Sequence, residues 1–125
     1  YPKSLDRFDF SYKLVGGMSL EDGAATLTAL VAAAVSKSLD MLPIRPIQLI
    51  VSGGGRKNTT MMREIATRGN IEVKTADNYD WRGDAIEAEC FAFLAARSLA
   101  NLPISYPKTT GVLKPLTGGV IAYPE

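Results

Sequence analysis

The stretch "LIVSGGGRKNTTMMREI", residues 49–65, decides the fold expected for this chain. An apolar run over 47–51, interrupted only by Gln48, predicts a strand over 46–52. Such a strand suits a parallel sheet, whose strands are buried on both faces. Three glycines follow it, and a helical pattern over 57–68 comes next. Glycine after a buried strand lets the backbone turn with positive φ and lets a ligand approach closely.

The flanking segments extend this unit into an α/β fold. "IEVKTA", residues 71–76, alternates like a second strand and completes a strand–helix–strand crossover. Gly69 is expected at the position that closes the helix over 57–68. Upstream, Ser19 with Asp22 resembles a capping box at the start of a long alanine-rich helix. That helix is expected to end near "LPIRP", residues 42–46, because proline disfavours its continuation. The tail is expected to be extended, with one strand near "GGVIAY", residues 118–123.

Composition limits the function classes. The chain has 125 residues, of which 46% are hydrophobic, as suits one compact domain over 1–125. Fourteen basic and thirteen acidic side chains leave a net charge of +1, which excludes charge-driven binding to nucleic acid or to an anionic membrane. One cysteine and no histidine argue against an internal disulfide and against zinc sites of the usual spacing. The longest apolar run, 23–35, is shorter than the roughly 20 residues of a membrane span. A cytoplasmic location fits best.

The glycine loop leaves two interpretations open. It is not a P-loop, and Asn58 stands where the third glycine of a dinucleotide-binding motif would be. A helix start after the loop would favour a phosphate, but a tight turn without a ligand gives the same pattern. Arg56 and Lys57 could face a phosphate or form a solvated pair at the loop tip.

A third helix is predicted over about 84–99, within "GDAIEAECFAFLAARSL". On a helical wheel its bulky side chains form one broad arc: Ile86, Cys90, Phe91, Phe93 and Leu94. Glu87 falls inside this arc and Glu89 falls outside it. A carboxylate among apolar neighbours should be paired, protonated or placed at the lip of a pocket. The alternative is a helix-terminal glutamate that interacts with its own backbone.

The sequence resembles the anhydro-N-acetylmuramic acid kinases. The resemblance lies in an ordered set of segments: "PKSLDRFDF", "AATLTALVAAAV", "VSGGGRKNTTMM", "GDAIEAECFAFLAARSL" and "TTGVLKPLTGGVIAYP". It implies the carboxy-terminal part of an actin/hexokinase-like (ribonuclease-H-like) ATPase fold, with a short parallel sheet and packed helices. It also implies phosphorylation of O6 of 1,6-anhydro-N-acetylmuramic acid by ATP, with hydrolytic opening of the anhydro ring, in peptidoglycan recycling.

The resemblance also implies site residues. Gly53, Gly54, Gly55 and Asn58 match the family's adenosine-motif loop, and Glu87 matches a sugar-site glutamate. ATP and Mg²⁺ are the expected cofactors, and the sugar is the expected partner, with a homodimer left open. Neither a "GTSxDG" type phosphate motif nor a "DTGPGN" type motif carrying the base aspartate occurs in the chain. The resemblance therefore assigns no catalytic residue and no metal ligand to these 125 residues, and predicts that they are inactive alone.

Two other function classes stay open. A Rossmann-type dinucleotide module would use Asp77, at the end of the second predicted strand, to bind a ribose. The absence of the third glycine argues against this dinucleotide-binding interpretation. A non-catalytic assembly domain would use the alanine-rich helix and the Met61–Met62 pair, although such residues are more often core.

Overall fold

A computed structural model describes residues 11–123, which divide into two units. The first unit ends at Asp84 and the second begins at Ala85, and each is described by itself. The first contains α1 (Leu20–Leu39), β1 (Gln48–Val51), α2 (Thr59–Gly69) and β2 (Glu72–Thr75). Short 3₁₀ turns stand at Tyr12–Val15, Gly54–Lys57 and Ala76–Tyr79. The second unit contains α3 (Ile86–Leu99) and the one-turn helix α4 (Pro107–Thr110).

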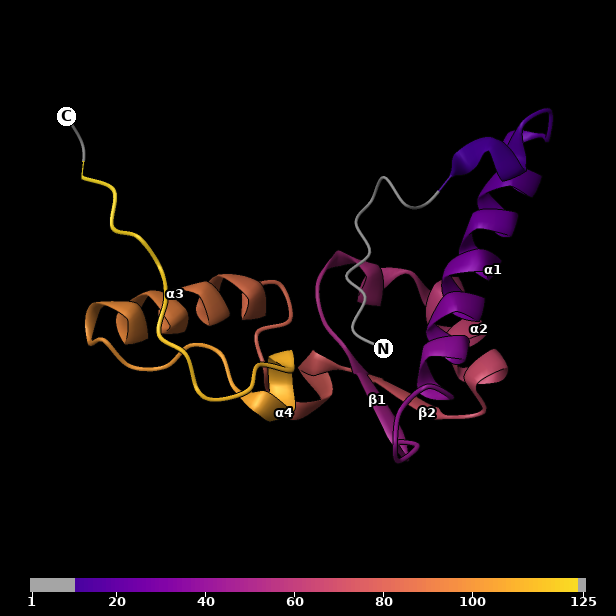
Figure 1. The fold of residues 1–125 in the computed structure, drawn as a ribbon. Coiled ribbons are helices and arrows are strands. Elements are labelled where there is room, and N and C mark those ends of the chain that lie inside the picture. The colour runs from indigo at the N-terminus through magenta and orange to yellow at the C-terminus, as the bar shows by residue number, and fades with distance from the viewer. Residues whose placement is uncertain (1–10, 124–125) are drawn as a thin grey trace. The chain divides into compact units, whose positions relative to one another are not determined.

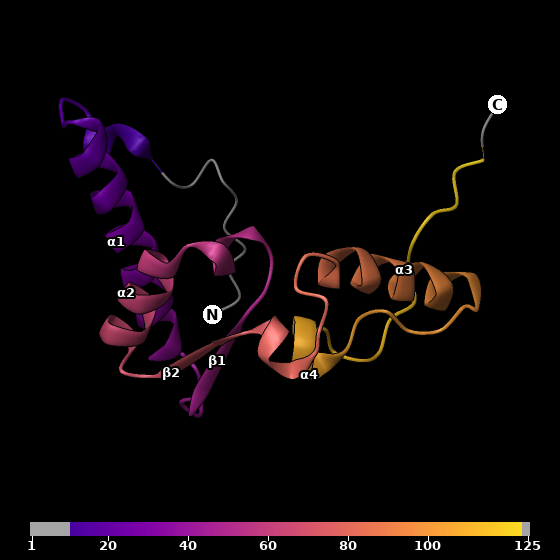
Figure 2. The same cartoon turned by 180° about the vertical axis from the view of Figure 1, so that it is seen from behind.

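The predicted strand–helix–strand unit is present. β1 and β2 pair in parallel, with Gln48 opposite Glu72 and Val51 opposite Thr75, and α2 connects them. Figures 1 and 2 show α1 and α2 lying side by side in this unit, and the two helices pack against each other. α2 also packs against β2. The α/β class predicted from the glycine stretch is confirmed.

The helix ends follow local chemistry. At the start of α1, Ser19 Oγ accepts a hydrogen bond from the backbone N–H of Asp22 at 3.0 Å, as the capping pattern predicts. α2 begins at Thr59 rather than at residue 57, because Asn58 is its cap and accepts from the N–H of Met61. The prediction that Gly69 closes this helix is wrong. Gly69 is still helical, and Asn70 takes the left-handed conformation with φ of 42°. Asparagine tolerates that conformation better than most residues.

Burial in the described residues is limited. The apolar side chains that are buried there are Ala32, Leu39, Ile65, Ile71 and Ala76. The expectation that the first strand is buried on both faces is wrong, since Ile50 is 37% exposed. The reason is that the sheet has two strands in the described part of the chain, and α2 packs against β2 rather than against β1. A self-contained domain of this length normally buries more apolar surface.

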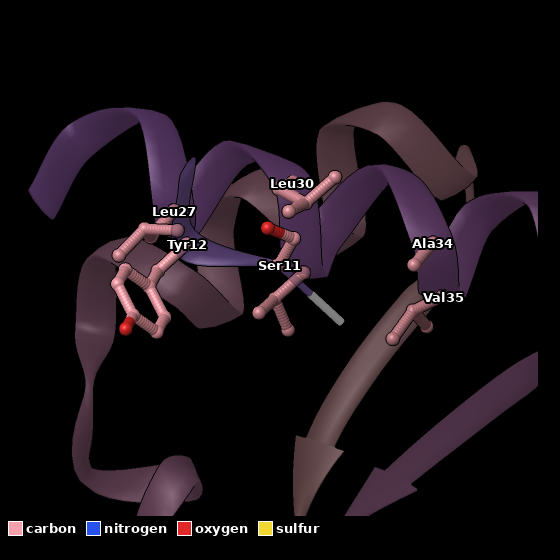
Figure 3. A pocket seen from close by; sticks show the side chains of 7 residues that line it. Ser11, Tyr12, Leu27, Leu30, Ala34 and Val35 are labelled. Carbon is pink, nitrogen blue, oxygen red and sulfur yellow. The ribbon is translucent and has the colours of Figure 1, made fainter. Parts of the chain in front are cut away.

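One open apolar surface lies along α1. A groove of about 480 Å³ is lined by side chains from α1 and from the segment before it: Ser11, Tyr12, Leu27, Leu30, Val31, Ala34 and Val35. Figure 3 shows Tyr12 and Leu27 toward one end of the groove and Ala34 and Val35 toward the other. The described residues of the first unit leave this surface uncovered, so α1 has an apolar face besides the one packed on α2.

In the second unit, Arg97 ties α3 to the segment that follows it. Its Nε donates to the carbonyl of Pro103 at 2.6 Å, and its Nη2 donates to the hydroxyl of Tyr106 at 2.6 Å. Its guanidinium also lies 5.4 Å from the ring centre of Phe93. The strand predicted over 118–123 is wrong, because these residues form no regular element. The extended tail instead contributes a single bridge, between Ser105 and Leu116.

Candidate nucleotide-loop site

The loop between β1 and α2 follows directly from its glycines. Gly53 has φ of 72°, a conformation that side chains with a Cβ rarely adopt, and it turns the chain out of the strand. Gly54 and Gly55 then begin a 3₁₀ turn without positive φ. A Cβ added at Gly54 would meet no atom within 4 Å, and one at Gly55 would make only an ordinary contact, 3.8 Å from the sulfur of Met61. The described structure therefore explains glycine at 53 but gives no internal reason for glycine at 54.

Of the two alternatives left open for Arg56, the solvated one is wrong, and the structure shows its guanidinium bonded inside the protein. Its side chain is 6% exposed. Its Nε donates to Asp77 Oδ2 at 2.6 Å, and its Nη1 donates to Asp84 Oδ1 at 2.6 Å and to the carbonyl of Gly53 at 2.9 Å. Nη2 donates to the second oxygens of Asp77 and Asp84, at 3.2 and 3.0 Å. Lys57 stays exposed and reaches Asp84 from outside, at 2.9 Å.

We call Arg56, Asp77 and Asp84 the Arg56 cluster, and its charges perturb one another. Hydrogen bonds from Arg56, and then from Lys57, hold the pKa of Asp84 far below its ordinary value. Hydrogen bonding to Arg56 likewise lowers the pKa of Asp77. The two carboxylates raise the pKa of Arg56, with Asp84 contributing most. All three groups are therefore charged at neutral pH.

The Arg56 cluster predicts acid sensitivity. A carboxylate whose pKa is lowered by folding stabilises the fold above its unfolded pKa, about 3.9 for aspartate, and loses that contribution as the pH falls through the folded value. We therefore expect the thermal unfolding midpoint of Asp84→Asn to lie below that of the wild-type chain at pH 7, and the gap to narrow below about pH 4. Calorimetry from pH 7 to pH 2 measures this gap.

The matched control is Glu21→Gln, which changes a carboxylate in the first turn of α1. Its midpoint should follow the wild-type midpoint across the same range. A gap for Asp84→Asn that stays constant down to pH 2 would contradict the ion-pair interpretation.

The predicted site residues stand in two groups. The contiguous loop holds Gly53, Gly54, Gly55 and Asn58, and Asn58 also caps α2 through its Oδ1. Glu87 lies in the first turn of α3, in the second unit, and is exposed. The bulky arc around it is not buried either, and α3 as a whole has no buried residue in the described structure.

Sequence reasoning missed the Arg56 cluster, although a signal was present. Arg56 and Asp77 each follow the carboxyl end of a strand, and the carboxyl ends of parallel strands lie along the same edge of a sheet. An arginine after one strand and an aspartate after its parallel neighbour could have suggested that the two side chains form an ion pair. The cluster also occupies Asp77, the residue considered for ribose binding in the dinucleotide alternative.

Other site types find little support in the described residues. Across residues 11–123, no group of three or more acidic, histidine or cysteine side chains is placed to hold a metal ion. Nor does that part of the chain contain a helix that is both long and apolar enough to cross a membrane.

The strand, glycine loop and capped helix define an α/β protein with an open loop at the carboxyl end of a parallel strand. Comparison with known proteins makes this specific: residues 4–124 match the family model for anhydro-N-acetylmuramic acid kinase, and the chain belongs to this family. The family predicted from the ordered motifs is thereby confirmed.

Named relatives agree. The chain is 58% identical over 122 residues to the anhydro-N-acetylmuramic acid kinase of Mesorhizobium japonicum, covering 98% of this chain and 33% of the relative. It is 59% identical over 119 residues to that of Brucella anthropi, covering 95% and 32%. It is 55% identical over 120 residues to that of Caulobacter vibrioides, covering 96% and 32%. The chain thus spans about a third of the length of the curated relatives it matches.

Proposed function

We propose that this chain is the carboxy-terminal part of a cytoplasmic ATP-dependent kinase for 1,6-anhydro-N-acetylmuramic acid. The whole protein would phosphorylate O6 of the sugar while water opens the anhydro ring, as a step in peptidoglycan recycling. The family match over residues 4–124 supports this proposal most directly. Partial burial of the two-stranded sheet also fits a chain that forms part of a larger fold, which we infer is the actin/hexokinase-like ATPase fold.

Within this kinase we assign the nucleotide to the loop of Gly53, Gly54, Gly55 and Asn58. The observation that carries the assignment is the empty space at Gly54, where a Cβ would meet no atom within 4 Å. A glycine that its own fold does not require is explained if a ligand approaches that backbone. With Asn58 Oδ1 occupied by the cap of α2, its amide nitrogen is the group left to face adenosine.

Mg²⁺ would accompany ATP, but the Arg56 cluster does not fit a Mg²⁺ site. Its two carboxylates lie beside the loop, and the guanidinium neutralises them through bonds to all four of their oxygens. Mg²⁺ binds through carboxylates, waters and substrate phosphates. We therefore assign no metal ligand and no catalytic base to this chain.

The test uses the full-length kinase, meaning this chain completed to the length of its relatives. ATP with Mg²⁺ should raise its thermal unfolding midpoint, since a ligand that binds only the folded state stabilises it. NAD should not raise it, and transfer of phosphate to the anhydro sugar should be detectable by mass spectrometry. A response to NAD alone would favour the dinucleotide module, and no response to either nucleotide would favour an assembly domain. Light scattering on the same sample reports whether two copies associate.

A prediction for the loop concerns Gly54. In the full-length kinase, Gly54→Val should raise the KM for ATP about tenfold, because the new side chain occupies the space given to the nucleotide and tenfold corresponds to about 1.4 kcal/mol. The KM for the sugar should change less than about twofold. Since nothing in the described structure lies within 4 Å of the added Cβ, the variant should fold.

Gly53→Val is the matched comparison for the turn-only interpretation. Gly53 has positive φ, so this substitution strains the backbone and should lower the unfolding midpoint as well as ATP affinity. Normal ATP kinetics in folded Gly54→Val would rule out the ligand role of the loop.

A further inference from the structure

Arg56 uses every donor that it has inside the protein. A guanidinium carries five N–H donors. Nε gives one hydrogen bond, to Asp77, and Nη1 and Nη2 give two each, to Gly53, Asp77 and Asp84. With its side chain 6% exposed and no donor left over, Arg56 has neither the surface nor the hydrogen atoms to bind a ligand. Any effect of Arg56 on ligand binding must therefore be transmitted through the residues that it contacts.

The neighbour that matters most is Gly53, whose two backbone polar groups are both held. Its carbonyl accepts from Arg56 Nη1 at 2.9 Å, and its N–H donates to the carbonyl of Gly83 at 2.9 Å. Gly83 itself lies against the guanidinium, since a Cβ there would stand 2.4 Å from Arg56 Nε. The turn out of β1 is thus fixed from two sides. Glycine-rich backbone is otherwise the most flexible kind, so fixing it has a large effect on where the loop points.

We propose that Arg56 is a positioning residue for nucleotide binding. It holds Gly53 in place and so sets the direction in which Gly54 and Gly55 present their backbone. This inference rests on the proposed function, because it takes the glycine loop to be the nucleotide loop. A loop ordered in advance loses less conformational freedom on binding, so its affinity is higher. Asp77 and Asp84 hold the guanidinium, so they affect the loop indirectly, through Arg56.

The main test is Arg56→Lys in the full-length kinase. Lysine keeps the charge but lacks the planar fork, so it cannot bond both aspartates and Gly53 together. The KM for ATP should rise at least tenfold, while the KM for the sugar stays within twofold and kcat at saturating ATP within threefold. A purely structural defect would instead reduce the active fraction, which lowers kcat and leaves both KM values unchanged.

Chemical rescue gives an independent readout. Arg56→Ala leaves a cavity with two carboxylates, and millimolar guanidinium chloride should return much of the lost ATP affinity. Sodium chloride at the same concentration should not. The control is Arg68→Lys, which makes the same replacement at an arginine ion-paired with Glu64 inside α2. It should leave both KM values within twofold of wild type.

Should the Arg56 variants not fold, Asp77→Asn and Asp84→Asn each keep one carboxylate partner and should raise the KM for ATP threefold or more. The inference is overturned if folded Arg56→Lys, or both folded aspartate variants, bind ATP as Arg68→Lys does. Its failure is distinct from failure of the proposed function, in which the wild-type full-length protein would not use ATP at all.

Discussion

The 125-residue chain alone is expected to give no detectable phosphorylation of 1,6-anhydro-N-acetylmuramic acid, whereas the proposed full-length kinase is expected to phosphorylate the sugar. Phosphoryl transfer depends on positioned phosphates, a metal ion and a group that activates the nucleophile. The sequence contains neither the phosphate motif nor the base-aspartate motif of the family, and residues 11–123 hold no cluster of metal ligands. A missing base by itself costs roughly 10²- to 10⁴-fold.

The measurement is ADP release coupled to a reporter enzyme, with and without the sugar. Circular dichroism of the same preparation must show helix and strand, so that a lack of turnover reflects missing groups rather than an unfolded chain. Sugar-dependent ADP release by the isolated chain, abolished by Gly54→Val, would contradict the prediction and would place a complete active site within these residues.

The core of the first unit could be predicted because its signals are local. A β-branched, apolar run before three glycines and an alternating "IEVKTA" after a capped helix specify two parallel strands and their connection. Ser19 predicted the start of α1 for the same reason, since a capping hydroxyl bonds within one turn of its own helix. In each case the deciding interaction joins residues that are close along the chain.

The Arg56 cluster could not be predicted in this way. Arg56 bonds Asp77 and Asp84, which lie 21 and 28 residues further along the chain, and its burial depends on that pairing. A charged residue after three glycines is most often solvated, so residue type alone gave the wrong environment. Once the two strands are known to be parallel neighbours, the pairing follows from where they end. Here tertiary structure determined the role of the residue.

In the tail and in α3, the sequence patterns predicted a strand and a buried face that the described structure does not contain. The apolar run in "GGVIAY", residues 118–123, needs a partner strand to become part of a sheet, and the described residues form no strand there. The apolar arc of α3 likewise predicts burial, yet Phe91 is 65% exposed and Phe93 is 59% exposed. An amphipathic pattern predicts that the apolar face of a helix is buried, but it does not identify the segment that covers that face. In a chain that spans about a third of its relatives, unfulfilled patterns of this kind are expected.

Glu87→Gln in the full-length kinase is expected to lower kcat/KM for the sugar at least tenfold. Two considerations motivate this: Glu87 lies in the apolar arc of α3, and the resemblance to the kinase family implies a sugar-site role for it. The structure leaves its side chain exposed in the first turn of α3. A carboxylate there can accept hydrogen bonds from sugar hydroxyls, and such charge-assisted bonds contribute roughly 1.5 to 3 kcal/mol each. Glutamine keeps the shape and removes the charge.

The control is Glu89→Gln, the same replacement two residues further along the helix and outside the apolar arc. Its unfolding midpoint should be measured together with its kinetics, so that any change in stability is separated from a change in sugar binding. We expect its kcat/KM to stay within about twofold of wild type, whereas a tenfold fall corresponds to about 1.4 kcal/mol lost from the transition state. The KM for ATP should be unchanged in both variants, which separates Glu87 from the glycine loop. If both variants fold and Glu87→Gln keeps wild-type sugar kinetics, Glu87 is only a helix-terminal carboxylate, and the sugar site must be built from other residues.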